Sequence, residues 1–166
     1  MILDDIKIKE ILLKENYVSE DDIQTAEDFS KSHNTSISDY LLSKNIITKD
    51  LIGQAIAESF KVSYTNLKSK QPLKEQILKI PESVARKFNI ILFKEDGKNI
   101  TIVTDNPLKK GLSTQLKKLF PKSKISVTYS LTEDILEIFV SYQKELKTRF
   151  SKIIKSGEHI APDILE

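Results

Sequence analysis

Cysteine is absent from this sequence of 166 residues, and glycine occurs at only four positions. Without cysteine the chain has no disulfide bridge and no thiolate chemistry, which is typical of a cytoplasmic protein. A phosphate-binding loop needs clustered glycines, and neither such a cluster nor the pattern GxxxxGK with serine or threonine occurs. The glycines are Gly53, Gly97, Gly111 and Gly157. The sequence therefore lacks the phosphate loop of nucleoside triphosphatases.

Long apolar runs are also missing, since none approaches the ~20 residues that span a bilayer. The first ten residues, MILDDIKIKE, carry Asp4 and Asp5 where a secretory signal carries positive charge. The net charge is only +2. Arginine, which forms paired hydrogen bonds with phosphates and guanine edges, occurs only at Arg86 and Arg149. We expect a cytoplasmic protein with no nucleic-acid partner and no direct membrane insertion.

Catalytic side chains are equally scarce. His33 and His159 lie in polar segments with no second histidine or cysteine at metal-ligand spacing. The pair Asp21-Asp22 stands at a predicted helix start, where the helix dipole favours carboxylates. No motif supplies a nucleophile with its base. We predict that the chain is not an enzyme and has no catalytic residues, no metal site and no cofactor.

A twelve-residue pattern occurs twice in the first part of the chain. LLKENYVSEDDI begins at Leu12, and LLSKNIITKDLI begins 29 positions later at Leu41. In each copy an apolar stripe is followed by an asparagine, Asn16 or Asn45, a residue that tolerates the left-handed conformation that ends a helix. The serine or threonine three positions later suits the N-cap of the next helix. The pattern predicts two tandem helical hairpins, that is, four short helices.

A pair of leucines precedes each asparagine: Leu12-Leu13 in the first copy and Leu41-Leu42 in the second. Two hairpins packed together can bury an apolar face that neither could bury alone. We expect at least one leucine of each pair to be buried between the hairpins.

The second part of the chain changes to strand and turn signals. Three segments are typical of strands, at residues 89–93, 100–104 and 124–129, and the last of them alternates apolar with polar residues. Three segments have helical patterns, at residues 80–88, at 107–120 after Asp105-Asn106-Pro107, and from Leu131 onward. We predict an α+β fold in which the four short helices precede a small antiparallel three-stranded sheet packed with helices.

These patterns predict three regions. Residues 1–61 form the helix-hairpin repeat, and residues 62–146 form the α+β subdomain. Residues 147–166 form a helical extension and a loose tail, because Gly157 and Pro162 interrupt regular structure there.

Lysines gather around the predicted helix at 107–120; they are Lys109, Lys110, Lys117, Lys118, Lys122 and Lys124. Such a cluster is either a solvated helix face or a surface for an anionic partner. No aromatic residues interleave with these lysines, which argues against a platform for single-stranded nucleic acid.

The doubled hairpin followed by this α+β unit resembles the N-terminal domain of type II secretion and type IV pilus assembly ATPases (the GspE N-terminal, or MshEN, module). The resemblance covers about residues 6–142 and rests on the order of its segments: the two repeats, ESFKVSYTNL, IPESVARKF, IILFKEDGKNITIVTDNP and TEDILEIFVSY. It implies a docking domain that engages another component of such a machine, either the assembly ATPase or the cytoplasmic face of an inner-membrane protein.

In some members of that family the repeat binds cyclic di-GMP. The family's spacing is kept here, with copies at 7–30 and 36–59. The nucleotide-site candidates that the resemblance implies are Lys7, Ile8, Leu12, Leu13, Asn16, Ser36, Ile37, Leu41, Leu42 and Asn45.

The polar positions of the motif differ from those of the family. Lys7 and Ser36 stand where the family has arginine. Residues with a side chain replace its glycines: Lys9, Asn16, Ser38 and Asn45. A side chain at such a position can block a ligand's approach to the backbone. We therefore expect a repeat retained for packing and cyclic di-GMP bound weakly or not at all.

Three functions stay open at this point. The first is a non-catalytic interaction or regulatory domain of a type II secretion or type IV pilus-type system. The second is a cyclic di-GMP-responsive sensor that regulates such a system. The third is a DNA-binding regulator built on paired helical hairpins, against which the near-neutral charge and the lack of a basic recognition helix argue.

Overall fold

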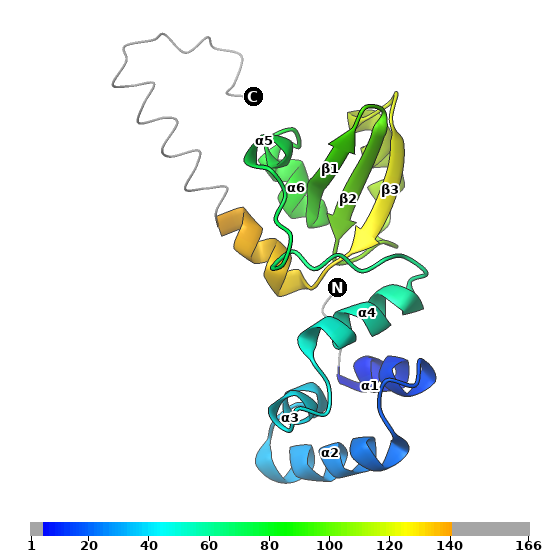
Figure 1. Cartoon of the computed structure of the whole chain (residues 1–166), viewed down its shortest axis with the longest axis vertical. Coiled ribbons are helices and arrows are strands. Elements are labelled where there is room, and N and C mark those ends of the chain that lie inside the picture. The colour runs from blue at the N-terminus through cyan, green and yellow to red at the C-terminus, as the bar shows by residue number, and fades with distance from the viewer. Residues whose placement is uncertain (1–4, 141–166) are drawn as a thin grey trace, which may run out of the picture.

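The computed structural model describes residues 5–140, and the predictions for residues 141–166, the end of the α+β subdomain included, lie outside that range. Figure 1 shows four helices at one end of the molecule and a small sheet with its helices at the other. The four helices are α1 (Asp5–Lys14), α2 (Glu20–His33), α3 (Ile37–Ser43) and α4 (Lys49–Ser59). The tandem helical hairpins predicted from the repeat are confirmed.

Both copies of the repeat end their first helix in the same way. Asn16 and Asn45 take the left-handed conformation, with φ of 56° and 54°. The N–H that follows each asparagine donates back over the last turn, from Tyr17 to the Leu12 carbonyl at 2.9 Å and from Ile46 to the Leu41 carbonyl at 3.0 Å. This Schellman pattern satisfies the carbonyls left free at the end of a helix.

Hydroxyl N-caps begin the second helix of each copy, as the sequence predicts. The Ser19 Oγ accepts from the Asp22 N–H at 3.1 Å, and the Thr48 Oγ1 accepts from the Leu51 N–H at 3.2 Å. These bonds satisfy N–H groups that have no partner inside the helix. The two copies therefore share turns as well as helices.

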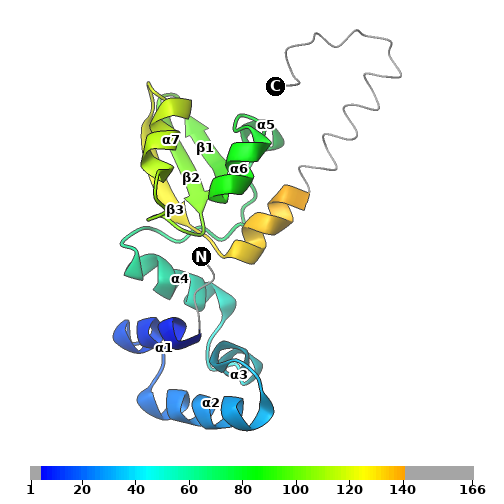
Figure 2. The same ribbon diagram turned by 180° about the vertical axis from the view of Figure 1, so that it is seen from behind.

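The second part contains the three-stranded sheet and its helices. The elements in order are α5 (Lys74–Ile77), α6 (Glu82–Phe88), β1 (Ile90–Asp96), β2 (Asn99–Thr104), α7 (Leu112–Leu119) and β3 (Lys124–Tyr129). Residues 132–140 are helical as well. Figure 2 shows α6 and α7 on one face of the sheet. The α+β class is confirmed.

The prediction of an antiparallel sheet is only half right. The strand order is β1-β2-β3, and β1 pairs antiparallel with β2 around the turn at Gly97. β3, however, runs parallel to β2. The reason is the connection: residues 105–123 cross over the sheet through α7, and a strand–helix–strand crossover returns the chain in its original direction.

The helix predicted at 107–120 starts later than expected. It begins at Leu112, after Gly111 in the left-handed conformation with φ of 83°, and Leu108 is 75% exposed. The Asp105 carboxylate does not cap a helix, because it accepts from Asn89 Nδ2 at 2.9 Å and Thr132 Oγ1 at 3.0 Å. Buried Asp105 thus ties the end of β2 to α6 and to the helix at 132–140.

Two hydrophobic clusters form the core. One lies between the sheet and its helices and includes the fully buried Ile90, Leu92 and Ile102. The other lies among α1–α4 and includes Leu12 and Leu41, both 0% exposed. One leucine of each pair is therefore buried, as predicted.

The end of β3 joins the helical repeat to the sheet. The Tyr129 side chain belongs to the hydrophobic cluster of the repeat, although its backbone is the last residue of β3. Tyr64 pairs with Tyr129 through an isolated bridge, and its ring lies so close to Gly53 of α4 that a Cβ there would stand 2.5 Å from the ring. Lys49 Nζ also bonds Glu133 Oε1 at 2.6 Å across the junction. Among residues 5–140, no helix is long and apolar enough to cross a membrane.

Candidate functional site

The nucleotide-site candidates separate into an apolar set and a polar set. The apolar ones pack in or against the hydrophobic cluster of the repeat; they are Ile8, Leu12, Leu13, Ile37, Leu41 and Leu42. Leu12, Ile37 and Leu41 are buried, whereas Ile8, Leu13 and Leu42 are half-buried. The apolar candidates hold the hairpins together, and the fully buried Leu12 and Leu41 present no side chain to a ligand.

The polar candidates lie mostly at helix ends. Exposed Asn16 and Asn45 end α1 and α3. Ser36 is the N-cap of α3, where its Oγ accepts from the Asp39 N–H at 2.9 Å. Lys7 lies exposed on α1. Three of the polar candidates thus serve to end or cap helices of the repeat: Asn16, Asn45 and Ser36.

The start of α3 already holds an anion that the chain itself supplies. The Asp5 carboxylate accepts from the Ile37 N–H at 2.6 Å, and from the Ser38 N–H and Oγ at 3.3 Å each. Free N–H groups at a helix start are the donors that a phosphate would use. With Asp5 bound there, a phosphate would meet a negative charge and occupied donors.

A second internal pair lies between α1 and α2. Lys9, which stands at a glycine position of the motif, forms an ion pair with Glu27. The Lys9 side chain is 30% exposed and that of Glu27 is 22% exposed, so most of each side chain is packed against the repeat. At a position where the family has glycine, this pair therefore adds the Lys9 side chain and, after Asp5, a second carboxylate, that of Glu27. Sequence reasoning identified the glycine losses but missed Asp5 and Glu27, which nothing in the motif marks.

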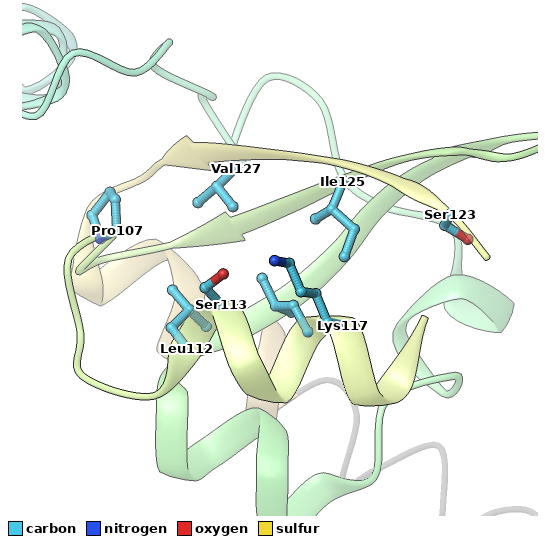
Figure 3. A pocket seen from close by; sticks show the side chains of 8 residues that line it. Pro107, Leu112, Ser113, Lys117, Ser123, Ile125 and Val127 are labelled. Atoms are coloured by element: carbon cyan, nitrogen blue, oxygen red, sulfur yellow. The ribbon is translucent and has the colours of Figure 1, made fainter. Parts of the chain in front are cut away.

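A hollow outside the repeat lies between α7 and β3 (Figure 3). It has a volume of about 250 Å³. Its lining is mostly apolar, with one lysine and two serines; the residues are Pro107, Leu112, Ser113, Leu116, Lys117, Ser123, Ile125 and Val127. We call it the α7–β3 pocket. Small-molecule sites typically measure ~300–1,000 Å³, so this pocket suits a side chain better than a cofactor.

The lysine cluster around this pocket could be read from the sequence, but the pocket itself could not. Residues 106–132 contain six lysines and no aspartate or glutamate. Lys109 bonds the Lys87 carbonyl, and within residues 5–140 the other five form no ion pair. The alternating Ile125 and Val127 signalled only a strand, because a hollow between a strand and a helix has no local sequence pattern.

Ionisable groups with shifted pKa values gather at the junction of the two clusters. Burial raises the pKa of the Tyr64 and Tyr129 hydroxyls, and nearby Asp50 and Asp105 add to this respectively. Burial also raises the pKa of the Asp134 carboxyl, against the opposing charge of Lys68, whose Nζ is 3.4 Å from Oδ1. These groups offer no nucleophile–base pair. Within the described part of the chain, no three or more histidines or carboxylates are grouped to hold a metal ion.

The sequence profile of the MshEN domain matches residues 60–149. Among solved structures, MshE with cdg (cyclic di-GMP) is similar at a TM-score of 0.55 and 17% identity, covering 81% of this chain and 97% of that one. The N-terminal domain of XpsE is similar at a TM-score of 0.43 and 11% identity, covering 81% and 93%. No curated protein matches the sequence.

Proposed function

The chain belongs to the MshEN domain family, which occurs in type II secretion and pilus ATPases, and we propose that it is a non-catalytic docking domain of such a system. Its partner is another component of the machine, either the assembly ATPase or the cytoplasmic face of an inner-membrane protein. The domain works in the cytoplasm, as the family's ATPases do.

The observation that carries this proposal is the family match over residues 60–149. That range contains the α7–β3 pocket and the lysines around it. It leaves out both repeat copies, at 7–30 and 36–59, in which the polar nucleotide positions are replaced. A domain with a basic, apolar-lined surface, whose residues 5–140 group no catalytic side chains, is suited to binding another protein.

A cyclic di-GMP sensor is the second candidate, and one observation favours it. MshE, solved with cyclic di-GMP, shares this fold over 81% of the chain. The side chains argue against it: Asp5 occupies the start of α3, and the Lys9–Glu27 pair stands on the motif. Lysine can hold a phosphate as a point charge, but it lacks the planar fork of arginine. We therefore propose weak binding or none.

Co-purification with candidate partners tests the docking role. The full chain is mixed with the cytoplasmic part of an inner-membrane component, or with the assembly ATPase, from the same machine, and the complex is measured by size-exclusion chromatography and calorimetry. We expect a 1:1 complex with one of them. If neither component binds at concentrations of about 100 μM, the docking role is wrong.

Calorimetry with cyclic di-GMP tests the second candidate. We expect no saturable heat with the unmodified chain. A dissociation constant in the low micromolar range or tighter would make the sensor role the better conclusion. A variant with arginine at positions 7 and 36, glycine at 9, 16, 38 and 45, and Asp5→Asn should bind more tightly than the unmodified chain. If it does not, the replaced positions do not account for the lost site.

ATP hydrolysis tests the non-catalytic part of the proposal. Phosphate release by the purified chain should equal that of a heat-treated control. Release above that control, in a preparation free of contaminating ATPases, would contradict it.

A further inference from the structure

One edge of the sheet is only partly covered. β3 is an edge strand, and in the described part of the chain residues 63–65, between α4 and α5, form backbone hydrogen bonds with it only at Tyr129. The Tyr129 N–H donates to the Ser63 carbonyl at 2.9 Å, and the Thr65 N–H donates to the Tyr129 carbonyl at 2.8 Å. The Thr65 hydroxyl also donates to the Thr128 hydroxyl at 2.8 Å. Backbone groups in a strand alternate in direction with a period of two. The N–H and C=O groups of Ile125 and Val127 therefore point to the same side as those of Tyr129. Within residues 5–140, no backbone group from outside the sheet forms a hydrogen bond with the outward-pointing N–H and C=O groups of Ile125 and Val127.

The α7–β3 pocket lies directly beside this free edge. In Figure 3 the side chains of Ile125 and Val127 point from β3 toward α7, and those of Ser113 and Lys117 point from α7 toward β3. A strand added to the edge would run along β3 at a spacing of about 4.8 Å. Every second side chain of that strand would then lie on the pocket side of the sheet.

The positive charge around the edge of β3 favours the addition of a strand with acidic side chains. Apart from Lys109, which bonds the Lys87 carbonyl, the lysines of this cluster are all exposed: Lys110, Lys117, Lys118, Lys122 and Lys124. No carboxylate lies within residues 106–132 to neutralise them. A second copy of this chain would bring the same lysines to the edge, and like charges repel. An acidic segment would be attracted instead.

We propose that the free edge of β3 and the α7–β3 pocket bind an extended, acidic segment of the partner protein by strand addition. Backbone hydrogen bonds form with Ile125 and Val127, an apolar side chain of the segment enters the pocket, and its carboxylates face the lysines. The chain's own residues 63–65 already pair with β3 in this way at Tyr129. This inference rests on the proposed docking function, for which it supplies the surface and the chemistry of the partner.

A peptide experiment tests the surface without any natural partner. The full chain is titrated with a fluorescently labelled eight-residue peptide that alternates valine with glutamate, and anisotropy is recorded. Two control peptides are used: one alternates valine with lysine, and the other carries N-methyl groups on one backbone edge. We expect binding of the first peptide that weakens with added salt, and at least about tenfold weaker binding of both controls, the equivalent of 1.4 kcal/mol.

Three variants locate the peptide on the chain. Ser113→Trp fills the pocket from an exposed position of α7, and Lys117→Glu reverses a lysine that lines it. Val127→Pro removes an N–H that points out of the sheet, a change that edge strands tolerate. Lys31→Glu, on exposed α2 at the far end of the molecule, is the charge-matched control. The first three should weaken the peptide about tenfold and Lys31→Glu should not, with all four showing the circular dichroism of the folded chain.

The possible outcomes separate this inference from the docking function. If the acidic peptide binds no better than either control, or an oligonucleotide of equal charge binds as well, strand addition is wrong. If a partner protein binds but is insensitive to Ser113→Trp and Lys117→Glu, docking stands and this surface is excluded. If peptide binding depends on the pocket but no machine component binds, the surface stands and the proposed function fails.

Discussion

Replacing Leu41 with alanine tests how the helical repeat is held together. Leu41 is 0% exposed in the cluster among α1–α4, whereas its neighbour Leu42 is half-buried beside it. Both leucines lie in the last turn of the same short helix, so Leu42→Ala is a control with the same helix propensity and the same chemistry. Only the degree of burial differs between the two changes.

The magnitude follows from that burial. Truncating a fully buried leucine costs about 2–5 kcal/mol, because transfer energy is lost and a cavity remains. A half-buried leucine loses roughly half of the area-dependent term, or about 1–2 kcal/mol. For a chain of this size each kcal/mol lowers Tm by roughly 2–4 °C. We therefore expect Leu41→Ala to lower Tm by about 4–20 °C and Leu42→Ala by about 2–8 °C.

Thermal and urea unfolding followed by far-ultraviolet circular dichroism measure both changes, because the repeat is almost entirely helical. Leu12→Ala, the counterpart of Leu41→Ala in the first copy, should reproduce the larger loss, since Leu12 is also 0% exposed. Equal losses for Leu41→Ala and Leu42→Ala would refute the reasoning. So would a loss below about 1 kcal/mol for Leu41→Ala, because the side chain would then be poorly packed.

Two further predictions concern single positions. Because Asn16 and Asn45 have φ of 56° and 54°, Asn→Gly at either should be neutral or stabilising, whereas Asn→Val should cost about 1–2 kcal/mol; equal melting temperatures for glycine and valine variants would contradict the left-handed turns. Burial raises the pKa of Asp134, so the folded chain holds that proton longer than the unfolded chain, and the stability it contributes falls as the pH rises above the ordinary aspartate range through the raised value. Asp134→Asn should therefore gain stability relative to the unmodified chain as the pH rises above the ordinary aspartate range in urea titrations, and a constant difference would show that burial does not penalise the charge.

Local signals in the sequence determined the joints of the repeat. Ser19 and Thr48 cap helices, and Asn16 and Asn45 end them, because each of these roles needs only backbone groups within five residues. The hairpin around Gly97 follows for the same reason. The pattern of β3 likewise predicted a strand at residues 124–129. The loss of the polar nucleotide positions was also readable from the sequence, and its effect on binding stays a prediction.

Tertiary structure decided what depends on distant partners. The sequence could not tell which leucine of each pair is buried, because both are equally apolar. It predicted the wrong direction for β3, since pairing depends on the path of the crossover through α7 and not on the strand's own residues. Asp5 reaches the start of α3 more than thirty residues away, and the α7–β3 pocket exists only where Ile125 and Val127 meet Ser113 and Lys117. Caps and turns are set by neighbours in sequence, whereas burial, strand direction and pockets are set by neighbours in space.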